Sequence, residues 1–147
     1  MHTLKIDQAS FLALAEEVLS RGGVLEFCAR GSSMSPAIQD GDTLRVCLHR
    51  ADELRVGSVI LYRDRQGRAV VHRIVAVRYA PCSTYLVRGD ASFGRAESVA
   101  ADQVLGVVAG VQREGGGFQA VAGVMLLPVR MSQRMWLALV RRVQIRL

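Results

Sequence analysis

Residues 70–77 have the sequence VVHRIVAV, in which β-branched side chains dominate. Such a run favours an extended strand over a helix. Shorter apolar runs lie before and after it, separated by turn sequences such as Asp40-Gly41-Asp42 and Arg65-Gln66-Gly67. The other predicted strands cover residues 25–28, 44–48, 59–62, 85–87 and 104–111. The sequence therefore predicts a mostly β, β-rich α+β domain of twisted antiparallel sheets.

A helix is predicted at each end of the chain. Residues 7–21 place apolar side chains at helical spacing, and Gly22-Gly23 ends the pattern. Residues 131–147 combine an apolar stripe with flanking arginines, which is typical of a basic amphipathic helix. Three interpretations of this segment stay open: a helix packed on the domain, a helix docked on an anionic membrane surface or a partner, and a frayed tail.

The positive charge of the chain is concentrated at its C-terminal end. The 147 residues fit one domain. Residues 1–129 hold 14 basic and 13 acidic side chains, whereas residues 130–147 hold five arginines and no acid. The sequence gives no basic face across the body, so we expect no nucleic-acid partner. We expect one folded domain over residues 1–129, followed by a basic amphipathic segment over residues 130–147.

Several sequence features bear on location and cofactors. No long uncharged apolar stretch suited to crossing a membrane occurs, and the first ten residues, MHTLKIDQAS, lack the apolar core of an export signal. Cys28, Cys47 and Cys82 are widely spaced and form no CxxC pair, so neither a disulfide scaffold nor a metal site is expected. These features predict a cytoplasmic or peripherally membrane-associated protein without a transmembrane helix, a metal or another cofactor.

The segment that points to chemistry is the turn at residues 31–42, with the sequence GSSMSPAIQDGD. A tight turn can present a serine hydroxyl on a rigid rim, but serine attacks only with an adjacent base. The single lysine, Lys5, lies outside the predicted β core. Of the histidines, His2 is terminal and His49 lies in a connection predicted to be solvated. His72 lies in mid-strand, as either a hydrogen-bonded sheet residue or a functional base.

Ordered blocks of the chain resemble type I signal peptidases and the wider superfamily of serine peptidases that includes the self-cleaving repressors. The blocks are SMSP at 33–36, GD at 41–42, LRVGSVILY at 54–62, VHRIV at 71–75, LVRGD at 86–90 and GVV at 106–108. The His72-Arg73 pair is similar to the branch that uses histidine where bacterial leader peptidases use lysine. The resemblance covers residues 25–110 and implies the twisted antiparallel β fold of that superfamily.

The resemblance also implies roles for individual residues. Ser33 would be the nucleophile, and His72 would be the general base that later protonates the leaving amine. Asp90 would be the carboxylate that supports the site, and the backbone N–H of Ser33 would stabilise the oxyanion. Met34 and Pro36 would shape the turn. The family binds its substrate as an extended segment beside a strand.

The chain departs from the family pattern at some of these positions. Gly31 stands where signal peptidases often carry an oxyanion-binding serine, and the adjacent Ser32 is the candidate to replace it. The Gly-Asp-Asn box of the family ends here in Ala91. The aspartate expected further along is missing, so Glu97 is the nearest candidate carboxylate. We also expect no N-terminal membrane anchor. Together these departures leave the Ser33–His72 pair intact and concern the substrate and the location.

The sequence thus predicts a serine endopeptidase that cleaves a precursor, such as a signal or leader peptide, after small residues. Two alternatives stay open: a non-catalytic peptide-binding or membrane-docked adaptor on the same fold, and a self-cleaving repressor-type peptidase. The second alternative is less favoured, because residues 1–22 are too short for a helix-turn-helix. The expected partners are an extended peptide segment and, through residues 131–147, an anionic membrane surface.

Overall fold

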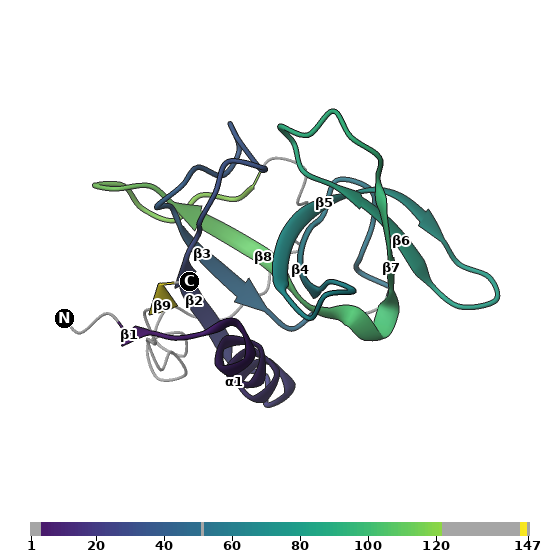
Figure 1. Cartoon of the computed structure of the whole chain (residues 1–147), viewed down its shortest axis with the longest axis horizontal. Coiled ribbons are helices and arrows are strands. Elements are labelled where there is room, and N and C mark those ends of the chain that lie inside the picture. The colour runs from purple at the N-terminus through teal and green to yellow at the C-terminus, as the bar shows by residue number, and fades with distance from the viewer. Residues whose placement is uncertain (1–3, 51, 122–144, 147) are drawn as a thin grey trace.

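The computed structural model describes residues 4–50, 52–121 and 145–146, which form one strongly curved sheet and one α-helix (Figure 1). The helix is α1 (Gln8–Ser20). The strands are β1 (Leu4–Lys5), β2 (Val24–Cys28), β3 (Thr43–Cys47), β4 (Val59–Arg63), β5 (Ala69–Arg78), β6 (Thr84–Arg88), β7 (Glu97–Ala100), β8 (Val104–Gln112) and β9 (Ile145–Arg146). Their order in the sheet is β1-β9-β2-β3-β8-β4-β5-β6-β7.

The predicted mostly β, β-rich α+β class is confirmed. Strands β2 to β8 pair in antiparallel fashion, and the predicted strand runs all fall on observed strands. Strand β7 was not among the predicted strands, because only one residue of its ESVA segment, Val99, is buried and apolar. This strand matters for the site, since it begins at Glu97.

The C-terminal residues Ile145–Arg146 correct one prediction. The helix predicted over residues 131–147 is wrong at these two residues, which form β9 between β1 and β2 and pair with both in parallel. A strand here satisfies backbone groups along the β2 edge, which a helix does not do. The remainder of the predicted helix, and the domain boundary at residue 129, lie outside the described residues.

Helix α1 confirms the prediction for residues 7–21. The Asp7 side chain caps it by accepting a hydrogen bond from the Ser10 backbone N–H at 3.0 Å, and Gly22, with φ 74°, follows its end. The helix lies beside β2 at one end of the sheet, and β6 and β7 lie at the other (Figure 1). In the part of the chain described here, no helix has the length and apolar character needed to cross a membrane.

The two faces of the sheet carry separate apolar cores. Strand β4 contributes to both, because Val59 and Leu61 point to one face and Ile60 and Tyr62 to the other. The first core joins α1 to β2, β3 and β8, and it also holds Met34 from the serine-containing turn. The second core lies between β4, β5, β6 and β7. The turn and the His72 strand are therefore each anchored to a packed interior.

We expect Phe11→Ala to lower the free energy of unfolding by about 3–5 kcal/mol, since it leaves a cavity in the first core. The Phe11 ring is fully buried and meets the Phe27 ring edge-on at a centroid distance of 5.0 Å. Urea unfolding followed by circular dichroism measures the change. The matched control is Phe93→Ala, because Phe93 is fully exposed; its effect should stay within about 0.5 kcal/mol. Equal effects of the two substitutions would contradict this packing of α1.

Candidate active site

The serine turn, residues 31–42, is held by hydrogen bonds within itself. The Gly31 backbone N–H donates to the Asp40 carboxylate at 2.8 Å, and the Ile38 N–H donates to the Met34 carbonyl at 2.9 Å. Gly31 has φ 89°, in the left-handed region that glycine adopts without strain. The side chains of Met34 and Ile38 are buried in the first core. The turn is thus fixed by its own hydrogen bonds and by two buried side chains, so it can present an exposed side chain in a defined place.

Ser33 lies on this turn and is exposed. Its backbone and His72 both lie close to Gly89, which follows β6. The Ser33 carbonyl accepts a hydrogen bond from the Ala91 N–H at 2.9 Å. A Cβ atom placed on Gly89 would lie 2.5 Å from the Ser33 carbonyl oxygen and 3.2 Å from Nε2 of His72. The Ser33 backbone and the His72 imidazole therefore flank one glycine so closely that a side chain does not fit there.

Ser33 and His72 also line one cavity, with a volume of about 380 Å³. This is within the usual size range of ligand pockets. Its lining includes the start of the serine turn and residues 68–72. The apolar lining consists of Phe27, Ala29, Met34, Ile38, Leu44, Ala69, Val70 and Val71. Ser33 and His72 thus line a groove of mixed character, whose polar lining also includes Gln8, Arg30 and Arg68.

The β5 edge beside this cavity is open. Strand β5 pairs with β4 over residues 69–73, but its pairing with β6 begins only at Arg73. Over residues 69–72, the edge away from β4 therefore has no strand partner among the residues that the structure describes. The Ala69 backbone N–H on this edge donates to the Gln8 side-chain oxygen at 3.0 Å. An extended peptide can pair with such an edge.

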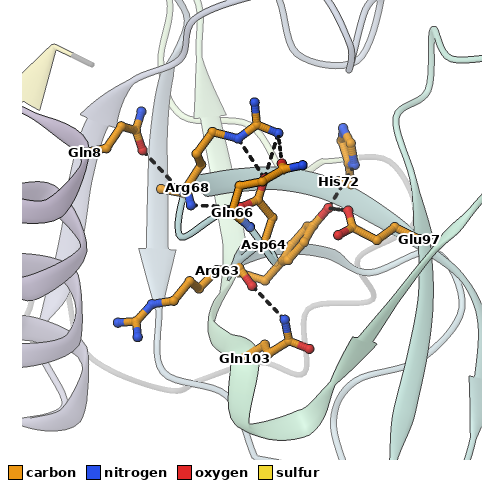
Figure 2. A network of polar contacts seen from close by, with 10 residues as sticks. Gln8, Arg63, Asp64, Gln66, Arg68, His72, Glu97 and Gln103 are labelled. Atoms are coloured by element: carbon orange, nitrogen blue, oxygen red, sulfur yellow. Dashed lines mark hydrogen bonds and ion pairs between the residues drawn. The ribbon is translucent and has the colours of Figure 1, made fainter.

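His72 has a polar partner on the side away from Gly89. The Tyr62 hydroxyl oxygen lies 3.2 Å from His72 Nδ1, and the same hydroxyl donates to a Glu97 carboxylate oxygen at 2.8 Å (Figure 2). Burial lowers the pKa of His72 below 6.5, and the negative charges of Glu97 and Asp90 oppose that shift. His72 is therefore mainly neutral at pH 7, which is the form that accepts a proton.

The hairpin that joins β4 to β5 fixes the relative positions of Tyr62 and His72. Its turn is built on the buried Asp64 carboxylate, which accepts from the backbone N–H groups of Gln66 and Arg68 at 2.9 and 2.8 Å (Figure 2). The Arg68 guanidinium also donates to this carboxylate at 2.8 Å. These bonds hold the register of the two strands, and with it the Tyr62–His72 contact.

The Asp90 carboxylate is bound by Arg73 rather than by the His72 imidazole. Its two carboxylate oxygens accept from the Arg73 guanidinium at 2.8 and 2.7 Å, and both side chains are about four-fifths buried. Arg73 also donates to the Gly57 carbonyl at 2.9 Å. The pair therefore ties the loop after β6 to β5 and to the turn before β4. The carboxylate connected to His72 by hydrogen bonds is that of Glu97, by way of Tyr62.

Tyr62 is the site residue that the sequence analysis missed. Its role could be recognised only from the register of β4 and β5, which brings the buried Tyr62 phenol beside His72. Ser32 and Met34 are where the sequence places them, in the serine turn. The prediction that His49 is solvated is wrong. His49 is partly buried, and its Nδ1 atom is buried without a hydrogen-bond partner in the described structure. Across residues 4–50, 52–121 and 145–146, no His, Cys, Asp and Glu side chains cluster as a metal site would require.

Comparison with known proteins finds no protein-family model and no curated protein that matches this chain.

We expect Gly89→Ala to displace the serine turn from His72, since the added Cβ overlaps the Ser33 carbonyl oxygen. The loss in the free energy of unfolding should be about 1–3 kcal/mol, the usual cost of overpacking. Gly94→Ala in the same loop is the control, because its Cβ would meet only the Ser92 hydroxyl at 3.4 Å. Thermal unfolding of both variants measures the difference. A Gly89→Ala protein as stable as the Gly94→Ala protein would count against the close approach at Gly89.

Proposed function

We propose that this protein is a serine endopeptidase in which Ser33 is the nucleophile and His72 the general base. One observation carries the proposal: the Ser33 backbone and Nε2 of His72 meet at Gly89 and line the same cavity. A serine beside a neutral imidazole is the pairing that activates a hydroxyl near pH 7. The blocks that resemble signal peptidases and their relatives support the same assignment.

The reaction follows from these two groups. The Ser33 hydroxyl attacks a peptide carbonyl carbon, a C–O bond forms, and the hydroxyl proton moves to Nε2 of His72. The C–N bond then breaks, and His72 returns the proton to the leaving amine. Water hydrolyses the resulting ester with His72 again as base. The backbone N–H of Ser33 is the proposed donor to the oxyanion, with Ser32 as the adjacent hydroxyl.

The proposed substrate is an extended segment of a precursor, such as a signal or leader peptide, cleaved after a small residue. The open β5 edge at residues 69–72 supports this class, since an extended backbone can pair with it and bring a carbonyl alongside the cavity. The apolar part of the lining supports an uncharged side chain where a substrate residue packs against it. Gln8 already occupies one hydrogen-bonding position on that edge, so a bound peptide competes with it at Ala69.

Location is a separate part of the proposal. A cytoplasmic or membrane-surface site of action fits the three cysteines, which are all free thiols. Attachment to an anionic membrane through residues 131–147 rests on the sequence pattern, because residues 122–144 lie outside the described part of the chain. Binding to vesicles with and without anionic lipid tests it for the intact chain.

We expect Ser33→Ala and His72→Ala each to reduce turnover by at least about 1,000-fold, because each removes one member of a unit that acts together. The assay is mass spectrometry on a pool of extended peptides with small residues at varied positions. The control is Ser98→Ala, which removes an exposed hydroxyl from β7 and should leave turnover unchanged.

If a folded Ser33→Ala protein still cleaves peptides, the assignment of Ser33 as nucleophile is wrong. Peptide binding without any wild-type cleavage, unaffected by Ser33→Ala, would instead favour the adaptor. Cleavage of the chain itself during long incubation would favour the self-cleaving alternative.

The pH dependence of kcat/KM should show an acidic limb with its midpoint below pH 6.5. The base must be neutral to accept the Ser33 proton, and burial lowers the pKa of His72 below its ordinary value of 6.5. Activity is therefore complete above that pKa and is lost as the pH falls through it. Rates measured from pH 4.5 to 8 on a peptide without titratable side chains test this. A midpoint above pH 6.5 would contradict the neutral, partly buried base.

A further inference from the structure

A buried tyrosine hydroxyl connects His72 to a carboxylate that the resemblance leaves without a defined role. The Tyr62 side chain is fully buried, yet its hydroxyl has two polar neighbours, Nδ1 of His72 at 3.2 Å and Glu97 at 2.8 Å. The three residues come from three strands, β4, β5 and β7. A polar chain of this kind inside an apolar core is costly unless every member is paired, so its bonding pattern is strongly constrained.

The sheet register produces this contact. His72 lies opposite Ile60 on β4, so Tyr62, two residues further on, shares its face and is its diagonal neighbour. Glu97 lies opposite Val87 on β6, and Val87 lies opposite Ile74 on β5. The carboxylate thus comes from a strand two places away from β5 and reaches the imidazole only through the phenol.

The number of protons on the phenol decides the direction of the hydrogen bonds. A tyrosine hydroxyl has one proton to donate, and an ionised carboxylate only accepts. Burial, reinforced by Glu97, raises the pKa of Tyr62 far above its ordinary value, so the phenol keeps its proton. That proton points to Glu97, and the phenol oxygen is left to accept from Nδ1–H of His72.

We infer that Tyr62 and Glu97 are the positioning residues of the site, holding His72 in the tautomer with its proton on Nδ1 and its lone pair on Nε2. This inference rests on the proposed function, because its value to catalysis is that Nε2 faces Gly89 and Ser33. Asp90, the carboxylate expected in this role, instead accepts hydrogen bonds from Nε and Nη2 of Arg73.

The charged groups around His72 give each variant a distinct signature. Glu97 acts from β7 through the phenol, and Asp90 acts from the loop after β6 with its charge offset by Arg73. Tyr62→Phe keeps the ring and its packing but removes the acceptor for Nδ1–H. Glu97→Gln keeps the shape but removes a negative charge that favours the imidazolium.

The first experiment is nitrogen NMR of the His72 ring in the full chain, without substrate, across a pH titration. In the wild type we expect Nδ1 protonated and Nε2 unprotonated above the His72 pKa. Tyr62→Phe should give a mixture of tautomers, and Glu97→Gln should shift the His72 titration to lower pH. The controls are Tyr79→Phe and Glu114→Gln, which change an exposed phenol and an exposed carboxylate and should leave His72 unchanged.

The second experiment is steady-state peptide cleavage by the same variants. Tyr62→Phe should lower kcat on the order of 100-fold with little change in KM, since the base is misplaced while the peptide groove is intact. Glu97→Gln should move the acidic limb of kcat/KM to lower pH, in step with the NMR titration. A general loss of stability would produce neither the tautomer change nor this pH shift.

The two experiments separate the inference from the proposed function. If Tyr62→Phe and Glu97→Gln both keep the wild-type His72 tautomer, His72 titration and kcat, the role of Tyr62 and Glu97 is overturned, even if the protein is a peptidase. The expected NMR changes in a protein that cleaves no peptide would support the hydrogen-bond chain and overturn the peptidase. A larger shift of the His72 titration by Asp90→Asn than by Glu97→Gln would return the role to Asp90.

Discussion

The close approach at Gly89 is the constraint on which the rest of the site depends. Three segments far apart in the sequence, the serine turn, β5 and the loop after β6, meet where a methyl group would overlap a backbone oxygen. Interiors packed this tightly transmit small displacements, so the position of the turn depends on what fixes each of the three. The turn is anchored by Met34 and Ile38 in the first core, and β5 by its pairing with β4. The loop is held by the Arg73–Asp90 ion pair.

That ion pair illustrates why a carboxylate close to a site need not take part in its chemistry. Arg73 binds both oxygens of Asp90 and reaches the Gly57 carbonyl, so one partly buried guanidinium ties together the chain before β4, β5 and the Gly89 loop. A largely buried ion pair of this kind fixes the position of the segments that carry it. Removal of one partner leaves the charge of the other buried and unpaired. The neighbouring residues His72 and Arg73 point to opposite faces of β5, as alternation along a strand requires. One can therefore serve the proposed chemistry while the other fixes the loop.

Patterns local in the sequence predicted much of the fold and part of the site. The β-branched runs identified the strands, and the helical spacing of apolar residues with Gly22-Gly23 bounded the helix, because these signals act over a few neighbouring residues. The Tyr62–Glu97 pair could not be predicted in this way. Its residues are 35 apart, and their contact depends on the register of β4, β5, β6 and β7 together. The strand at Ile145–Arg146 was missed for a similar reason, since the open edge of β2 outweighs the local helical pattern there.

The phenol between His72 and Glu97 changes the electrostatic balance that a direct carboxylate contact would set. A carboxylate hydrogen-bonded to an imidazole favours the charged ring and raises its pKa. With Tyr62 interposed, the charge is further away and its influence weaker, while the direction of the hydrogen bond at Nδ1 is preserved. Burial then outweighs both nearby carboxylates, and the pKa of His72 falls below its ordinary value. A hydroxyl spacer can in this way orient an imidazole without keeping it protonated, which is the combination that a base working at neutral pH requires.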